Sequence, residues 1–361
     1  MGRTSIIALS GPSSSGKTTL ARLLQRIFAH LDANNAQTQF PISTFIIHED
    51  DFYHPDDKIP YTTTKSGTYI QDWDCLGALD INFLSSALRY VREHGHLPPR
   101  LKSKEDLNDA PPDSGVDDSL IDELKRVVID RLSGFHFPFR TDGWTLAILE
   151  GFLLFAPPPS DDTVTVSTGA REGGGHPLRL VHDQIDVRLF LPAPYDLVKE
   201  RREKRSGYVT IGPAPTPDTR QQPSGSQMDK GKDAKEEDEV DLLAEDDRPP
   251  QNFWTDPPGY VDDIVWPRYV RDHAWLLLPE DEGSQSEALA TIQDDDELIR
   301  KVGQGVTLRI DAGVIVAPGQ GSFPMAELLK WAVEEVMKHL EQTSRKAQSP
   351  STAADSLLGS M

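Results

Sequence analysis

The fold is decided near the start of the chain, where residues 5–24 read SIIALSGPSSSGKTTLARLL. The apolar run at 6–9 is typical of a buried parallel strand. Leucines then recur at helical spacing, which predicts a helix over 17–31. Between them, GPSSSGKT at 11–18 fits the pattern G-x-x-x-x-G-K-[ST]. Small residues there let backbone N–H groups turn toward phosphate oxygens at the positive end of the helix. The sequence therefore predicts a phosphate-binding loop.

Each position of this loop has a predicted task. Lys17 reaches the β- and γ-phosphates of a nucleotide, and the hydroxyl of Thr18 coordinates Mg²⁺. A flexible Gly/Ser turn that matches by chance is the alternative, but the flanking strand and helix favour the phosphate loop. We expect the nucleotide to contact the following residues: Gly11, Ser13, Ser14, Ser15, Gly16, Lys17, Thr18 and Thr19.

Strands and helices alternate along the rest of the chain. Apolar runs predict strands at 44–48, 145–149, 187–191 and within 306–317, and helical periodicity predicts helices at 77–93, 119–132, 194–204 and 323–341. This alternation predicts an α/β protein of the P-loop NTPase fold, with a mainly parallel β-sheet flanked by helices.

Three segments rich in Pro, Gly, Ser and charge interrupt the alternation, at 99–117, 156–179 and 212–251. Such composition cannot bury a core, so we expect surface or disordered insertions there. The sequence predicts one P-loop domain over 1–342 and a disordered tail over 343–361.

Composition excludes several classes of function. The net charge of −21 over 361 residues argues against a nucleic-acid-binding surface, which needs a basic face. The single cysteine, Cys75, excludes an internal disulfide and a Cys-rich metal site. No apolar run reaches the ~18 to 20 residues of a membrane span. We expect a cytoplasmic protein, with the nucleus as a second compartment, that binds neither nucleic acid nor membrane. The sequence makes no prediction of the oligomeric state.

Carboxylates follow two of the predicted strands. Asp50 lies just after the strand at 44–48, and Glu150 ends the strand at 145–149. Ligands of open α/β sheets bind at the carboxyl ends of strands. Asp50 could therefore accept a proton or hold Mg²⁺, and Glu150 resembles a Walker B carboxylate near the metal. The alternatives are a helix N-cap at Asp50 and a solvent-exposed strand end at Glu150.

Two further stretches carry candidate binding residues. Trp73 beside Asp74 is suited to stacking a heterocycle and binding sugar hydroxyls, although a buried Trp and a capping Asp are the simpler local interpretation. The basic cluster at 199–205 could close over a transferred phosphate, or could be a solvated helix face.

Taken together, these stretches resemble the nicotinamide riboside kinases, within the uridine-kinase-like phosphate-loop kinases. The resemblance rests on six segments in the family's order: GPSSSGKTTLARLLQ, HEDDFYHP, QDWDCLGALD, ILEGFLLF, RREKR and DPPGYVDDIVWPRY. The long insertions between them resemble fungal members. The resemblance implies a fold like that of nucleoside and nucleoside-monophosphate kinases, with a lid.

The resemblance also implies a reaction and its catalytic residues. The expected reaction is ATP-dependent phosphorylation of the 5′-hydroxyl of nicotinamide riboside, with nicotinic acid riboside as a further candidate acceptor. Asp50, Lys17 and Glu150 are the implied catalytic residues, and Thr18, Asp50 and Glu150 the implied Mg²⁺ ligands. Arg201 and Arg205 would act on the ATP side.

The resemblance assigns the acceptor side as well. The implied riboside-binding residues are Asp50, Asp51, Phe52, Tyr53, Trp73, Asp74, Arg202 and Tyr208. Trp73 stands where tyrosine is typical of the family. The adenine site is expected in the loop at 317–321, around Pro318 and Gln320.

Two other functions remain open on sequence grounds. One is a kinase of the same fold that acts on uridine or cytidine, pantothenate or phosphoribulose. The other is a non-catalytic nucleotide-binding regulatory protein, with the acidic insertion at 212–251 as its interaction segment.

Overall fold

The structure is a computed structural model that describes residues 3–29, 42–103, 114–133, 144–159, 175–213, 242–243, 251–279 and 286–348. Its centre is a five-stranded sheet in the order β2-β5-β1-β6-β9, in which every pair of neighbours is parallel. The strands are β1 (Arg3–Ser10), β2 (Ile42–His48), β5 (Trp144–Gly151), β6 (Val187–Phe190) and β9 (Ile315–Val316). The predicted mainly parallel P-loop fold is confirmed.

The order of the strands fixes where a ligand can bind. The chain passes from β1 to β2, returns in β5 between them, and then crosses to β6 on the other side of β1. Strand order therefore reverses at β1, and a crevice opens outside the carboxyl ends at such a switch point. The loop at 11–16 follows β1 directly and lies at this crevice.

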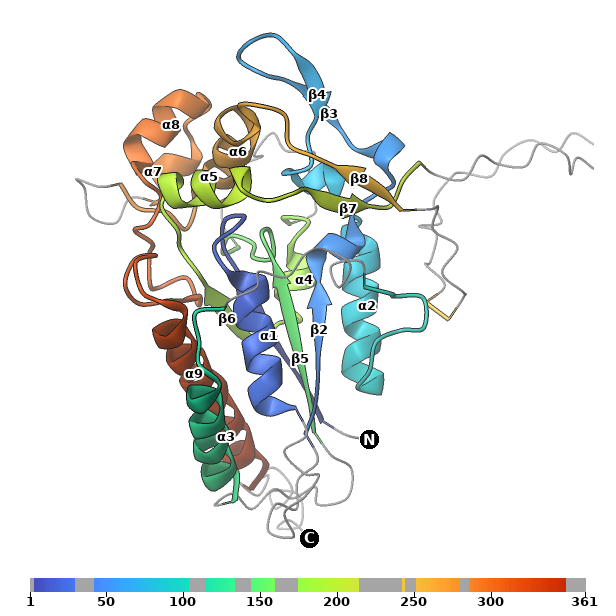
Figure 1. The fold of residues 1–361 in the computed structure, drawn as a ribbon, viewed down its shortest axis with the longest axis vertical. Helices are drawn as coiled ribbons and strands as arrows, with labels where there is room; N and C mark the ends of the chain where they lie inside the picture. The colour runs from blue at the N-terminus through green and yellow to red at the C-terminus, as the bar shows by residue number, and fades with distance from the viewer. Residues whose placement is uncertain are drawn as a thin grey trace, which may run out of the picture.

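Helices cover both faces of the sheet (Figure 1). One face is covered by α1 (Lys17–Phe28), α3 (Asp118–Ser133) and α9 (Met325–Gln348), and the other by α2 (Ile81–His94) and α4 (Arg179–His182). Alternation along β1 supplies both cores, because successive side chains of a strand point to opposite faces. Ile7 and Leu9 pack in the first core, and Ile6 and Ala8 in the second.

A smaller layer lies over the carboxyl ends of the strands, at the top of the view in Figure 1. It contains the helices α5 (Tyr195–Glu203), η5 (Val261–Val265), α6 (Trp266–Asp272), α7 (Ser286–Ala290) and α8 (Asp295–Val302). It also contains two antiparallel pairs of three-residue strands, β3 (Tyr61–Thr63) with β4 (Tyr69–Gln71), and β7 (Tyr208–Thr210) with β8 (Asn252–Trp254). Short 3-10 turns, η1 (Glu49–Phe52), η2 (Asp56–Lys58) and η3 (Leu76–Ala78), complete it.

The predicted helices and strands of the sheet are present, with changed ends. The last helix continues to Gln348, seven residues beyond its predicted end at 341, and Thr343 and Ser344 are buried, so the predicted tail begins too early. In the predicted strand region at 306–317, only 315–316 joins the sheet, and Leu308 forms an isolated bridge to Leu277.

Within the predicted insertions, the structure describes only residues 99–103, 114–117, 156–159, 175–179, 212–213, 242–243 and 251. Some of these ends belong to the core, because Leu101, Ala156 and Leu178 are buried. The predicted insertions are therefore too wide at these ends, and their middle parts lie outside the described residues. Among the helices of the described part of the chain, none has both the length and the apolar content needed to cross a membrane.

Candidate functional site

The loop at 11–16 has the backbone conformation of a phosphate cradle. Ser14 and Gly16 have positive φ values of 59° and 99°. At Gly11, where φ is 150°, an added Cβ would lie 2.3 Å from the carbonyl oxygen of Leu191. Only glycine allows this close approach, so it fixes the entry of the loop. The loop leads directly into α1, which begins at Lys17 and presents its positive end to a phosphate.

Lys17 and Thr18 start α1 with their polar groups toward the crevice. The ammonium of Lys17 is buried and donates a hydrogen bond to the carbonyl of Pro12 at 2.9 Å. Burial lowers the pKa of Lys17, although the charges of Glu150 and Asp50 partly offset this. The hydroxyl of Thr18 donates to Oε1 of Glu150 at 3.1 Å. These contacts bring the predicted phosphate-binding Lys and Mg²⁺-binding Thr to one place.

Glu150 ends β5 beside the end of β2, where its register partner is His48. Nδ1 of His48 lies 2.7 Å from Oε1 of Glu150, and both side chains are buried. Burial raises the pKa of Glu150, but the hydrogen bonds and charges of His48 and Lys17 outweigh it, so the pKa is lowered. Glu150 is therefore an ionised carboxylate that faces the phosphate loop. It is not the exposed strand end that was the alternative.

Asp50 lies in η1 at the end of β2 and is half-buried. Burial raises the pKa of its carboxyl, and the charge of Glu150 raises it further, whereas Arg205 and Lys17 lower it. A carboxylate with a raised pKa accepts a proton more readily at neutral pH than an ordinary aspartate. Asp50 therefore has the chemistry of a general base.

The neighbouring Glu49 fixes the position of this turn. Its side chain is fully buried, and Oε2 accepts hydrogen bonds from the backbone N–H groups of Phe152 at 2.7 Å and Leu153 at 3.1 Å. These bonds tie η1 to the chain that follows β5. Burial raises the pKa of Glu49 to about 8. Glu49 thus sets the distance between the carboxylates of Asp50 and Glu150 without lining the cavity itself.

The arginines of α5 reach the phosphate loop. Nη1 of Arg201 donates to the carbonyl of Ser14 at 3.2 Å, and Nη1 of Arg202 donates to the hydroxyl of Ser13 at 2.8 Å. The guanidinium of Arg205, just after the helix, lies 4.1 Å from the ring centre of Tyr208. Arg201, Arg202 and Arg205 therefore form a wall over the loop, whereas Lys204 belongs to a solvated face on which it pairs with Glu200.

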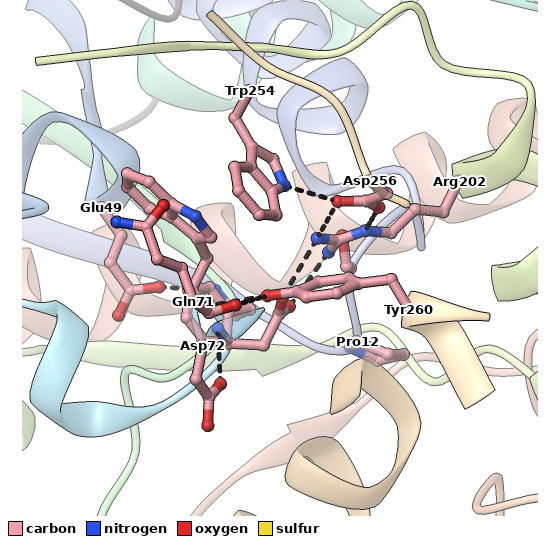
Figure 2. A network of polar contacts seen from close by, with 12 residues as sticks. Pro12, Glu49, Gln71, Asp72, Arg202, Trp254, Asp256 and Tyr260 are labelled. Atoms are coloured by element: carbon pink, nitrogen blue, oxygen red, sulfur yellow. Dashed lines mark hydrogen bonds and ion pairs between the residues drawn. The ribbon is translucent and has the colours of Figure 1, made fainter. Parts of the chain in front are cut away.

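Arg202 also binds two carboxylates on the other side of the crevice (Figure 2). Its guanidinium forms two parallel bonds of 3.0 Å to Asp74, and its Nε lies 2.6 Å from Asp256. Burial raises the pKa of Asp74 to about 6, and Arg202 offsets only part of the shift. One buried cation thus serves two buried anions, so the cluster carries a net charge of about −1 when both are ionised.

Aromatic rings enclose the space next to this cluster. Trp73 is buried, and its ring centre lies 5.4 Å from that of Tyr53 and 5.7 Å from that of Trp254. Its backbone N–H donates to the hydroxyl of Tyr260 at 3.0 Å. In the described part of the chain its indole N–H has no hydrogen-bond partner. A buried donor without a partner is costly unless a ligand supplies one.

One cavity of about 890 Å³ joins these groups. It is lined by these predicted residues: Ser13, Ser14, Ser15, Gly16, Lys17, Thr18, Thr19, Asp50, Tyr53, Trp73, Asp74, Glu150, Arg201, Arg202, Arg205 and Tyr208. Ala317 and Gly321 of the expected adenine loop also line it, next to Phe323, whereas Pro318 and Gln320 do not. A volume of this size is typical of a small-molecule site.

Besides Pro318 and Gln320, three predicted residues do not line the cavity, namely Gly11, Asp51 and Phe52. Gly11 acts through its backbone, as described above. Asp51 and Phe52 are buried outside the cavity lining, and the ring of Phe52 packs 4.9 Å from that of Phe83. The 3-10 turn explains this, because it directs Asp50 to the cavity and the next two side chains to the core. The cavity lining therefore does not support the predicted substrate contacts of Asp51 and Phe52, and Phe52 packs in the core instead.

Sequence reasoning assigned no role to several residues of the site. Glu49 and His48 lie beside Asp50, but nothing in their pattern indicates that they fix the positions of Asp50 and Glu150. Trp254, Asp256 and Tyr260 follow the acidic insertion. A signal was available there, because an aromatic residue close to a carboxylate repeats the pattern of Trp73 and Asp74.

No group of three or more His, Cys, Asp or Glu side chains within the described ranges is arranged to hold a metal ion. Mg²⁺ in phosphoryl transfer uses one or two protein carboxylates and completes its shell with phosphates and water. The hydroxyl of Thr18 and the carboxylate of Glu150, already in contact, are such hard oxygen donors.

Comparison with known proteins finds relatives that match most of this chain. No protein-family profile matches it. It is 28% identical over 279 residues to a nicotinamide riboside kinase of Schizosaccharomyces pombe, covering 77% of this chain and 83% of that protein. It is 26% identical to a nicotinamide riboside kinase of Saccharomyces cerevisiae, covering 82% and 91%. A human protein, nicotinamide riboside kinase 1, is 24% identical over 86% of this chain and its own full length. The resemblance predicted from the six motifs is confirmed.

Proposed function

We propose that this chain is a nicotinamide riboside kinase, which transfers the γ-phosphoryl group of ATP to the 5′-hydroxyl of nicotinamide riboside in NAD salvage. The relatives that carry this name match most of the chain. The observation that carries the proposal is that one cavity is lined both by the phosphate loop and by Trp73 and Asp74, with Arg202 bonded to Ser13 of the loop and to Asp74. Asp50 lines the cavity between them, as a base for the acceptor hydroxyl must.

The phosphate loop holds the donor. Backbone N–H groups of residues 11–16 and the N-terminus of α1 bind the phosphates, and Lys17 leaves Pro12 to bind the transferred group. Arg201 and Arg205 stabilise negative charge that spreads over the phosphoryl oxygens in the transition state. Because the loop and α1 are already in place, little reorganisation is needed when ATP arrives.

The acceptor is positioned by the opposite wall. The rings of Trp73 and Tyr53 contact the nicotinamide, and Asp74 accepts hydrogen bonds from the ribose hydroxyls. Asp50 then accepts the 5′-hydroxyl proton while the oxygen attacks the γ-phosphorus and the bond to ADP breaks. Glu49 and His48 act as positioning residues, because each fixes a carboxylate that faces the reacting groups.

Thr18, Asp50 and Glu150 are the residues that would hold Mg²⁺. When bound, the ion neutralises charge on the β- and γ-phosphates. The lowered pKa of Glu150 supports this assignment, because a metal ligand must be ionised.

The proposal is tested by measuring ADP release from the purified protein with ATP and Mg²⁺. The acceptors are nicotinamide riboside, nicotinic acid riboside, uridine, pantothenate and none. We expect strong turnover with nicotinamide riboside and background rates with uridine and pantothenate. Turnover with uridine or pantothenate alone would change the proposed acceptor but leave the proposed kinase activity standing. ATP binding without turnover on any acceptor would favour a regulatory protein.

A further inference from the structure

Trp254 lines the cavity but was not among the predicted site residues. It ends β8, the strand that follows the long acidic insertion, and its register partner in β7 is Tyr208. Both side chains line the cavity. Tyr208 and Trp254, 46 positions apart in sequence, are therefore neighbours in the lining of the cavity. The inference drawn below rests on the proposed function and concerns which acceptor that function selects.

The indole of Trp254 is held in one orientation. Its Nε1 donates to Oδ1 of Asp256 at 2.9 Å (Figure 2). Its ring centre lies 5.7 Å from that of Trp73 and 5.8 Å from that of Tyr260, in tilted and edge-on arrangements. Asp256 is itself fixed by the guanidinium of Arg202. The ring therefore presents a defined surface, and a ligand need not order it on binding.

The surroundings of this ring favour a cation. Asp74 and Asp256 share Arg202 as their ion-pair partner, so this three-residue cluster has an excess of one negative charge when both are ionised. The guanidinium of Arg205 lies on the neighbouring ring of Tyr208, 4.1 Å from its centre. A hydrogen bond from the indole N–H to a carboxylate also polarises the ring and makes its faces more negative. Ring faces of this kind attract cations, and tryptophan does so more strongly than other aromatic residues.

We propose that Trp254, oriented by Asp256, selects acceptors whose heterocycle is positively charged. Nicotinamide riboside carries a quaternary pyridinium ring, whereas the ring of uridine is neutral. Trp73 and Trp254 together form an aromatic enclosure for that ring, and the carboxylates of Asp74 and Asp256 supply the surrounding negative potential. Trp254 is thus a specificity-determining residue of the acceptor site.

A purely structural role makes a different prediction. Trp254 also packs beside the cluster of Trp73, Tyr260 and Val261. If it only covered this cluster, its removal would lower the rate with every acceptor by the same factor. A ratio of rates for two acceptors of equal shape and different charge separates the two roles.

The test compares nicotinamide riboside with its 1,4-dihydro form, which has the same substituents and a neutral ring. kcat/KM is measured for both with the wild type, Trp254→Leu and Phe253→Leu. We expect the wild type to prefer the cation and Trp254→Leu to reduce that preference about fivefold. Phe253 is the matched control, because it is 55% exposed on the opposite face of β8 and does not line the cavity. Its replacement should leave the ratio unchanged.

Three outcomes overturn the inference. An equal loss with both forms in Trp254→Leu would assign the residue to packing alone. A wild type that uses both forms equally would show that charge is not selected, while leaving the kinase function intact. A wild type that uses neither would instead refute the proposed function, and the inference with it.

A second variant covers the case in which Trp254→Leu fails to fold. Trp254→Phe keeps an aromatic ring between Trp73 and Tyr260 but lacks the N–H that Asp256 orients. We expect its melting temperature to stay near that of the wild type and its preference for the cation to fall about twofold. An unchanged preference in this folded variant would contradict the role of the bond to Asp256.

Discussion

The two ends of the cavity are built in different ways. At the donor end, consecutive residues of one loop direct backbone N–H groups and Lys17 toward a ligand, and few side chains depend on one another. At the acceptor end, Asp74, Arg202 and Asp256 come from distant segments and already bind each other. We therefore expect substitutions at the donor end to change function alone, and substitutions at the acceptor end to change function and stability together.

The largest effect is expected at Asp50, which lies between the two ends. Asp50→Asn removes the base but keeps the shape of the side chain, so kcat should fall about a thousandfold. ATP binding, measured by calorimetry, should stay close to that of the wild type because the loop is untouched. Asp57→Asn, at an exposed position of η2, is the control and should be fully active. A rate for Asp50→Asn within tenfold of the wild type would contradict the assignment.

Neighbouring arginines offer the most direct test of the difference between the ends. Arg202→Met leaves Asp74 and Asp256 buried without their cation, so the free energy of unfolding should fall by about 3–5 kcal/mol. Arg201→Met removes an exposed side chain whose hydrogen bond reaches only the carbonyl of Ser14. It should change stability by less than about 0.5 kcal/mol while raising KM for ATP. Urea denaturation measures the stability of both variants, and steady-state kinetics measures their KM for ATP. Equal losses of stability in the two variants would contradict the expected difference between the two ends of the cavity.

The acceptor end should also respond to pH through Asp74. Its pKa is about 6 in the folded protein against 3.8 for an ordinary aspartate, so the folded state holds its proton more tightly. The free energy of unfolding must then fall as pH rises from about 4 to 6, by about 3 kcal/mol in total from this group. Asp74→Asn lacks this contribution. Urea denaturation at pH 4.5 and 7 should show a larger loss of the free energy of unfolding in the wild type than in the variant. Equal losses in the two proteins would contradict the raised pKa of Asp74.

The smallest effect is expected from the long insertion. The β7–β8 strand pair is fixed where the insertion leaves and re-enters it by Asp56, whose Oδ2 accepts hydrogen bonds from Thr210 at 2.9 Å and Asn252 at 3.0 Å. We propose that residues 214–241 can be replaced by a flexible linker of about ten residues. Leu242 is kept because it packs against the core. kcat/KM and the melting temperature should both stay near wild type. A large loss of activity would make the insertion part of the lid.

The donor end was predictable from the sequence because its chemistry is local. One pattern at 11–18, between a strand and a helix, specifies both the loop and the helix terminus. The same holds for Asp50 and Glu150, because parallel strands bring their carboxyl ends to one edge of the sheet. The predicted helices of the core also matched because their apolar periodicity is strong, and the predicted strands matched because their apolar runs are continuous.

The acceptor end was only partly predictable because it depends on tertiary contacts. Trp73 and Asp74 were identified, but the pairing of Arg202 with Asp256 joins segments that the insertion separates in sequence. Three-residue strands such as β7 and β8 carry too few positions to show a period. The errors at Asp51 and Phe52 have a similar origin, because the direction of each side chain in a 3-10 turn is set by packing and not by residue type.

Gly151 shows how one added methyl group could inactivate this site by disturbing the packing of the protein itself. An added Cβ there would lie 2.4 Å from Oε2 of Glu49, the oxygen that receives the amides of Phe152 and Leu153. A single methyl group would therefore push apart the turn that carries Asp50 and the strand that carries Glu150. In natural variants, Gly151→Ala would be classed as a conservative substitution because it exchanges one small apolar residue for another. The substitution would displace the carboxylates of both Asp50 and Glu150, although it adds no charge and removes no polar group.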